Sequence, residues 1–127
     1  MAPREVLFLL GRGGVILWSD ASTSPVALPD SRARWEKIWE LRDQLEEIAH
    51  SHPHGPLAFS NEDETTMLAL TSALGRTLRF SVIAPEGMVV RDGDRTLCAD
   101  AEPWWTELLR LASGMHAKAS EISRKEV

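Results

Sequence analysis

Residues 6–10 form a continuous apolar run, Val-Leu-Phe-Leu-Leu, in a chain of 127 residues. An uninterrupted β-prone run of this kind is typical of a strand buried on both faces in the middle of a sheet. Such a sheet needs helices on its faces, because its apolar side chains would otherwise meet water. The glycine-rich segment 11–14 interrupts the run, and residues 15–18 resume it, which predicts a hairpin.

Strand-like and helix-like patterns alternate along the rest of the chain. Residues 19–30 are rich in serine, proline and aspartate and are expected to form a loop. We therefore expect an α+β or mixed α/β fold in which a curved mixed sheet is flanked by helices. The further expected elements are a helix capped by Asp30 or Ser31, a strand near 46–52, a helix from Ser60 to Gly75, strands over 76–84, 88–91 and 95–98, and a helix beginning at Pro103.

Helical spacing also predicts which side chains face the core. Trp104 and Trp105 are adjacent and cannot share one face of a helix, so one of them is expected to be exposed. Cys98 is expected to be a small buried residue. The apolar residues expected on the buried faces of the three helices are Trp35, Ile38, Trp39, Leu41 and Leu45, then Met67, Leu68, Leu70 and Leu74, and then Trp104, Trp105, Leu108, Leu109 and Leu111.

The formal net charge of the chain is -5, which argues against a surface built to bind nucleic acid. Cys98 is the only cysteine, so neither an intramolecular disulfide nor a thiolate zinc cluster can form, and we expect a cytoplasmic protein. Residues 5–10 are too short to span a bilayer, and we expect no signal peptide. We expect one domain over residues 1–118 and a disordered polar tail over 119–127.

Two histidines, His50 and His52, lie two residues apart in the strand expected near 46–52. Side chains alternate across a strand, so both imidazoles would face the same side. The turn that follows can bring the helix beginning at Ser60 back over this side, with Asp63 in its first turn. Two imidazoles and one carboxylate leave a fourth tetrahedral position open, as in a catalytic zinc site.

The same residues also have structural interpretations. Ser60 and Asp63 fit a capping box, and that pair by itself is more often a helix cap than a site. Two neighbouring histidines are most often solvated, and His54, beside a loop glycine, is expected to be solvated and could line a substrate approach. The conjunction is what favours a metal site: His-x-His, seven residues, serine, two residues and aspartate.

This string, which begins His-Ser-His-Pro at His50, resembles the zinc motif of the JAB/MPN-domain metalloproteases, the JAMM family. The resemblance implies the three-layer, cytidine-deaminase-like fold of that family and a compact bacterial-type member. It implies that His50, His52 and Asp63 are zinc ligands. It also implies that Ser60 is a catalytic residue that helps to stabilise the oxyanion.

Members of this family also carry a glutamate on an early strand, which acts as general acid and base. Glu5, at the head of the apolar run that ends in glycine, matches it, so the resemblance implies a catalytic role for Glu5. The structural interpretation is that Glu5 marks an exposed strand end. The other glutamates that stay open for this role are Glu36, Glu40, Glu46 and Glu47.

The resemblance implies a zinc-dependent isopeptidase or peptidase, similar to deubiquitinases. Its substrate would be a ubiquitin-like or sulfur-carrier protein, cleaved after the C-terminus, whose extended tail would add to a sheet edge. A non-catalytic MPN-type scaffold and a RadC-like protein stay open as alternatives, as does a homodimer or a further partner protein. A zinc deaminase is disfavoured because its Cys-x-x-Cys ligand pair is absent. We expect no nucleic-acid or membrane partner.

Overall fold

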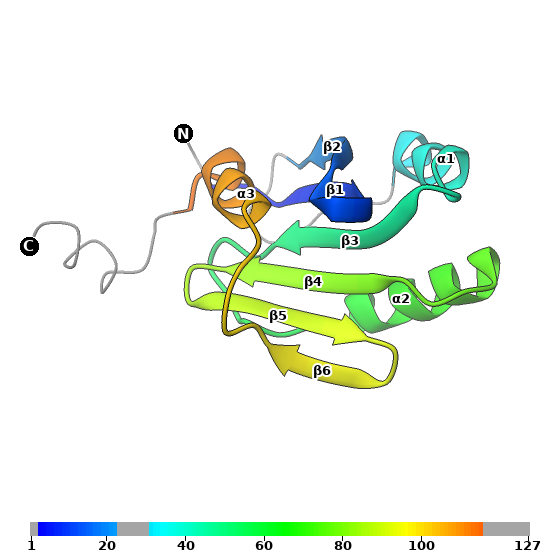
Figure 1. Cartoon of the computed structure of the whole chain (residues 1–127). Helices are drawn as coiled ribbons and strands as arrows, with labels where there is room; N and C mark the ends of the chain where they lie inside the picture. The colour runs from blue at the N-terminus through cyan, green and yellow to red at the C-terminus, as the bar shows by residue number, and fades with distance from the viewer. Residues whose placement is uncertain (1–2, 23–30, 116–127) are drawn as a thin grey trace, which may run out of the picture.

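The computed structural model describes residues 3–22 and 31–115. It has an α+β fold in which six strands form one mixed open sheet with three helices, which confirms the predicted fold class. The elements in chain order are β1 (Val6–Gly11), a short 3-10 turn (Arg12–Gly14), β2 (Ile16–Ala21), α1 (Arg32–Glu40), β3 (Leu45–Ser51), α2 (Asn61–Leu74), β4 (Arg79–Ala84), β5 (Gly87–Asp92), β6 (Arg95–Cys98) and α3 (Trp105–Ser113) (Figure 1).

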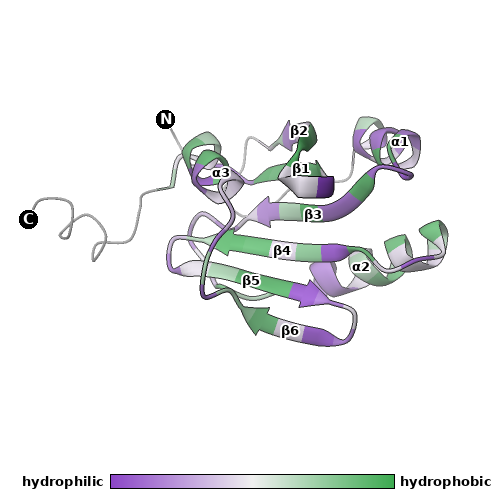
Figure 2. Ribbon diagram, in the orientation of Figure 1, coloured by the Kyte–Doolittle hydropathy of each residue, from purple (hydrophilic) through white to green (hydrophobic). Residues whose placement is uncertain are grey.

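The strand order in the sheet is β2-β1-β3-β4-β5-β6, so the apolar run of β1 lies inside the sheet as predicted. Neighbouring strands are antiparallel except β3 and β4, which are parallel and are connected through α2. A parallel pair needs such a crossover connection. Figure 2 shows hydrophobic residues along much of β4 and both kinds of residue on each helix, as expected for helices that cover a sheet.

Helices cover both faces of the sheet, which gives three layers. Alternate residues of β1 divide between two cores. Leu7 and Leu9 pack in a cluster with residues of α1 and α2, whereas Val6, Phe8 and Leu10 pack in a cluster with residues of α3. In Figure 1, α3 lies in front of the sheet and α2 behind it. The side covered by α1 and α2 is called the α2 face below, and the other side the α3 face.

Capping residues fix the starts of the first two helices. The Ser31 hydroxyl accepts a hydrogen bond from the backbone N–H of Arg34, so Ser31 caps α1, and Asp30 lies outside the described residues. Ser60 caps α2, and Gly75 ends it with a φ of 70°. Glycine adopts this left-handed conformation at little cost, which explains why the helix stops there.

The first helix is shorter than its apolar spacing predicted. It ends at Glu40, and Leu45, which we expected on its buried face, is instead the first residue of β3. Leu45 is fully buried. A buried leucine fits the apolar face of a helix and a buried strand equally well, so apolar spacing alone could not assign Leu45 to the right element. The loop prediction was wrong over residues 19–21, which belong to β2, and residues 23–30 lie outside the described part of the chain.

Some apolar side chains that we expected in the core are exposed. A helix turns by about 100° per residue, so adjacent positions cannot share one buried face. Trp105 is 1% exposed and Trp104 is 61% exposed, which confirms that only one of the two is buried. The other residues expected in the core but found exposed are Trp39, Leu68, Leu108 and Leu111.

The prediction that Cys98 is buried was also wrong. Cys98 is exposed, because β6 is an outer strand of the sheet and all four of its residues are exposed. The expected tail over 119–127 lies outside the described residues. Within residues 3–22 and 31–115, none of the helices has the length and apolarity that crossing a bilayer requires.

The two adjacent tryptophans provide a test of the α3 packing. Trp105→Ala should lower the free energy of unfolding by about 3–5 kcal/mol, because it leaves a cavity in the core. Trp104→Ala removes the same side chain from the surface and should lower it by less than about 1 kcal/mol. Urea denaturation followed by circular dichroism measures both values. Equal losses in the two variants would contradict the orientation of α3 described above.

Candidate metal centre

Three segments far apart in the sequence bring four predicted side chains together. Glu5 immediately precedes β1, His50 lies near the end of β3, His52 follows β3, and Asp63 lies in the first turn of α2. The antiparallel register between β1 and β3 pairs Leu7 with His50, so the beginning of β1 lies beside the end of β3. After β3 the chain reverses direction, and the first turn of α2 brings Asp63 close to the two histidines.

The alternation of side chains in the strands puts these groups on one face of the sheet. Leu7 belongs to the core of the α2 face, so Glu5, two residues earlier, points to that face as well. Ile48 belongs to the same core, and His50 follows it by two residues. The predicted common orientation of His50 and His52 is therefore found, on the face that α2 covers.

The ring nitrogens of the two histidines and the Asp63 carboxylate point to a common centre. The Nε2 atoms of His50 and His52 are 3.2 Å apart. Asp63 Oδ1 lies 3.1 Å from His50 Nε2, and Asp63 Oδ2 lies 3.5 Å from His52 Nε2. The three side chains are largely buried, with exposed fractions of 10% to 19%. The centre is therefore largely, but not completely, shielded from solvent.

Glu5 lies next to this centre. Its carboxylate and one ring nitrogen each of His50 and His52 all lie within 4.8 Å of one another, so these three residues form a group that could hold a metal ion. Glu5 is only 8% exposed, which rules out the interpretation that it marks an exposed strand end. A buried carboxylate needs a charged or hydrogen-bonding partner, and the two imidazoles are close enough to act as one.

The loop after β3 fixes the orientation of the His52 ring. His52 Nδ1 is 3.0 Å from the carbonyl oxygen of Pro56. A carbonyl oxygen only accepts hydrogen bonds, so Nδ1 carries a proton, and when the ring is neutral the lone pair of Nε2 points toward the centre. Gly55, with a φ of 72°, allows the chain to turn here, and its N–H donates to the His52 carbonyl oxygen at 2.9 Å. Metal-binding histidines typically have such a partner on the second nitrogen.

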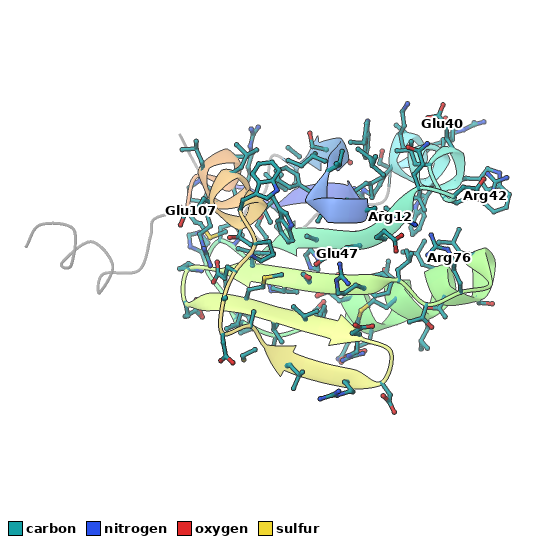
Figure 3. The ribbon with its side chains drawn as sticks, in the orientation of Figure 1. Arg12, Glu40, Arg42, Glu47, Arg76 and Glu107 are labelled. Carbon is teal, nitrogen blue, oxygen red and sulfur yellow. The ribbon has the colours of Figure 1, made fainter. Side chains whose placement is uncertain are left out.

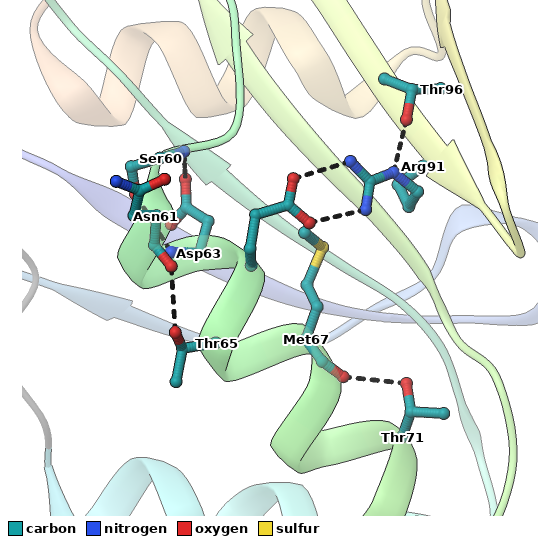
Figure 4. Close-up of polar contacts among 9 residues, drawn as sticks. Ser60, Asn61, Asp63, Thr65, Met67, Thr71, Arg91 and Thr96 are labelled. Carbon is teal, nitrogen blue, oxygen red and sulfur yellow. Dashed lines mark hydrogen bonds and ion pairs between the residues drawn. The ribbon is translucent and has the colours of Figure 1, made fainter.

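Asp63 takes part in the helix cap and in the centre at the same time. The Ser60 hydroxyl accepts from the Asp63 N–H at 3.0 Å, and Asp63 Oδ2 accepts from the Ser60 N–H at 2.8 Å (Figure 4). The predicted capping box is therefore present. The other carboxylate oxygen of Asp63, Oδ1, lies close to His50. The structural and the functional interpretation of this pair do not exclude each other.

An ion pair anchors the first turn of α2 to the sheet. Arg91 of β5 donates to both carboxylate oxygens of Glu64, each at 2.8 Å, and also contacts Thr96 of β6 (Figure 4). The Arg91 guanidinium also lies 5.1 Å from the centre of the Phe59 ring. Because Glu64 directly follows Asp63, these contacts hold the helix turn that carries the Asp63 carboxylate. The sequence did not single out this pair.

The surroundings shift the pKa values of the two carboxyl groups in opposite directions. Burial raises the pKa of Glu5 above its ordinary value of 4.5, although His50 and His52 partly offset this. Burial also acts on Asp63, but hydrogen bonds from the two histidines outweigh it and hold the pKa of Asp63 well below its usual range. Two carboxyl groups separated in this way suit different roles, one that exchanges protons and one that stays ionised.

His52 is affected by the same contacts. Burial alone would lower the pKa of His52, but the hydrogen bond with Asp63 and the hydrogen bond with the Pro56 carbonyl outweigh it, so the pKa is raised. Without a metal ion, the proton on His52 and the charge on Asp63 therefore stabilise each other. A bound cation would replace that proton, which makes metal binding dependent on pH.

The other glutamates considered for the catalytic role lie elsewhere. Glu36, Glu40 and Glu46 are exposed. Glu47, labelled in Figure 3, is buried, but it pairs with Arg79 and accepts from the Ser81 hydroxyl. It precedes Ala49 by two residues and so lies on the α3 face, whereas the histidines lie on the α2 face. His54 is exposed.

A scan against protein-family models finds no family that matches this chain. A search of curated proteins finds no match either. What the centre can do therefore has to be argued from its own geometry and chemistry.

The raised pKa of Glu5 predicts that this residue destabilises the metal-free fold. A group whose pKa is raised on folding contributes stability that is present below the unfolded pKa and is lost as the pH rises through the folded pKa. At pH 7 Glu5→Gln should therefore raise the melting temperature of the metal-free protein by a few degrees, whereas at pH 4 the gain should shrink. Differential scanning calorimetry measures both.

Glu46→Gln is the matched control for this experiment, because Glu46 is an exposed residue of β3. It should leave the melting temperature unchanged at either pH. A lower melting temperature for Glu5→Gln at pH 7 would mean that the ion pairs of Glu5 with the histidines exceed the cost of burying it.

Proposed function

We propose that this chain is a zinc-dependent peptidase or isopeptidase. The observation that carries the proposal is the set of distances between His50 Nε2, His52 Nε2 and the Asp63 carboxylate, which lie between 3.1 and 3.5 Å. Zinc binds imidazole nitrogen and carboxylate oxygen at about 2.0–2.2 Å in tetrahedral sites, which corresponds to ligand-to-ligand distances of about 3.3–3.6 Å. The distances between the three side chains are thus close to those between the ligands of a tetrahedral zinc ion, which supports the proposal.

The donor set also supports zinc. Two imidazoles with one carboxylate are the protein ligands of several hydrolytic zinc sites, which keep one position open. Glu5 belongs to the same group of possible ligands, so two arrangements compete. We favour Asp63 as the third ligand and Glu5 as the proton carrier, because the raised pKa of Glu5 suits proton exchange and the lowered pKa of Asp63 suits permanent ionisation.

In this proposal each side chain has one task. A zinc ion in the centre supplies Lewis acidity, which acidifies a water molecule and polarises a carbonyl group. The Glu5 carboxylate takes a proton from the attacking water and returns it to the leaving amine. The Ser60 oxygen accepts from the Asp63 N–H, which leaves its hydroxyl hydrogen able to donate to the oxyanion. His52 is kept in the right tautomer by the Pro56 carbonyl.

The substrate that we propose is a ubiquitin-like or sulfur-carrier protein, cleaved after its C-terminus. This part rests on the resemblance of the His-x-His, Ser60 and Asp63 pattern to the JAMM motif. An extended tail can bind by adding a strand to a sheet edge, and β2 and β6 are the two edge strands of this sheet. β2 is the nearer one to the centre, since its Asp20 pairs with Leu7, which in turn pairs with His50.

Metal content tests the ligands. After reconstitution with Zn²⁺ and desalting, the wild-type chain should contain about one zinc per molecule, and His50→Ala or Asp63→Ala should contain almost none, because removing one of three ligands leaves too weak a site. Mass spectrometry of the dissolved metal measures this. His54→Ala is the matched control, since His54 is an exposed histidine of the adjacent loop and should keep the zinc. Full zinc content in His50→Ala would refute the centre.

Glu5→Gln separates the two arrangements of the site. If Glu5 is the proton carrier, the variant should keep one zinc and cleave a sulfur-carrier protein extended by a peptide after its C-terminal Gly-Gly at least about 100-fold more slowly than the wild type. Gel electrophoresis and mass spectrometry of the products follow the cleavage. Loss of zinc would make Glu5 a ligand. A wild-type protein that binds zinc and this fusion tightly, but does not cleave it, would support a scaffold instead.

A further inference from the structure

The residue between the two histidines has contacts of its own on the opposite face of the sheet. Ser51 is completely buried, and it points to the α3 face because its neighbours His50 and His52 point to the α2 face. Its hydroxyl oxygen accepts from the Val6 N–H at 2.8 Å. The hydroxyl also donates, over a longer distance of 3.5 Å, to the carbonyl oxygen of Arg4.

These two contacts lie on either side of Glu5 in the sequence. The register between β1 and β3 ends at the pair of Leu7 and His50, so no backbone ladder continues to residue 6. On its other side β3 stays paired with β4 as far as Ser51, and the His52 N–H donates to the Ile83 carbonyl oxygen at 2.8 Å. The Ser51 hydroxyl takes the place of the missing ladder bond at Val6, the residue that directly follows Glu5.

The same segment is held from two other sides. The Glu5 carbonyl oxygen accepts from the Ser22 N–H at 2.8 Å, at the end of β2. The Arg4 N–H donates to the Ser113 carbonyl oxygen of α3 at 2.9 Å. Neither of these contacts involves β3. Among these side contacts, only the two bonds of Ser51 tie the residues on either side of Glu5 to β3, the strand that carries His50.

We propose that Ser51 is a positioning residue for Glu5: its hydroxyl sets the distance between the Glu5 carboxylate and the two imidazoles. This inference rests on the proposed function for its catalytic consequence, because Glu5 is the proton carrier there. A carboxylate displaced by a fraction of an ångström transfers protons more slowly even when all ligands remain in place. Ser51 would thus affect turnover without touching the reacting atoms.

Ser51→Ala tests the proposal together with Ser51→Thr, which restores a hydroxyl. We expect Ser51→Ala to keep about one zinc per chain and to lower kcat about 10-fold to 100-fold with KM nearly unchanged, and Ser51→Thr to recover most of the activity. Ser81→Ala is the matched control. Ser81 is also completely buried, lies on the same face in the neighbouring strand β4, and contacts Glu47 rather than residues 4–6. It should leave kcat unchanged.

Hydrogen exchange of the Val6 amide supplies a measurement that needs neither metal nor substrate. In the metal-free protein this amide should exchange at least 10-fold faster in Ser51→Ala than in the wild type, and Ser81→Ala should leave it unchanged. Circular dichroism at the assay temperature establishes that each variant is folded. Unchanged exchange would overturn the proposal even if the chain proves to have another function.

The remaining outcomes also decide between interpretations. Loss of zinc in Ser51→Ala would overturn the proposal, because the serine would then shape the ligands rather than place Glu5. Faster exchange with full activity would overturn it as well, since the hydrogen bond would be purely structural. If the wild type binds zinc but cleaves nothing, the proposed function fails, whereas faster Val6 exchange in Ser51→Ala alone still supports the link between Ser51 and the Glu5 segment.

Discussion

The antiparallel pairing of β1 with β3 is the constraint on which the centre depends. It joins segments about 45 positions apart in the sequence and brings the beginning of one strand beside the end of the other. Burial of the apolar side chains of β1 on both faces makes a shift of this register costly, because a shift by one residue would exchange the two faces. The positions of Glu5 and His50 relative to each other are therefore fixed by the packing of the whole sheet.

The first turn of α2 combines the helix cap with the candidate metal centre. Asp63 caps the helix with one oxygen and approaches His50 with the other, while Glu64 anchors the same turn to β5. A negatively charged group at a helix N-terminus is stabilised by the helix dipole, so the Asp63 carboxylate is favourable at this position even without a metal ion. For Glu5 the two imidazoles offset the cost of burial only in part, since the pKa of Glu5 stays raised.

Much of the fold could be predicted from the sequence, because strong local signals coincide with it. The apolar run of β1, the cap at Ser60 and the glycine stop at Gly75 are each determined by nearby residues. Burial was predicted less well, since the exposure of Leu68 and Cys98 depends on which neighbour covers each element. In the centre, the pattern of residue types predicted which side chains meet. It could not predict the Pro56 carbonyl, the Arg91 ion pair or the Ser51 hydroxyl, because these contacts depend on backbone positions in space. For the Ser51 contact, the only signal in the sequence was that a residue with a hydroxyl group lies between the two histidines.

The alternation of β3 gives two adjacent residues entirely different surroundings. His50 faces the centre, whereas Ala49 and Ser51 are buried on the side of α3. One strand thereby contributes an imidazole to the candidate metal centre on one face and packed side chains to the core on the other. A substitution at His50 therefore changes the polar centre, whereas one at the adjacent Ala49 changes the packing beneath α3, so neighbouring positions of this strand are subject to different constraints.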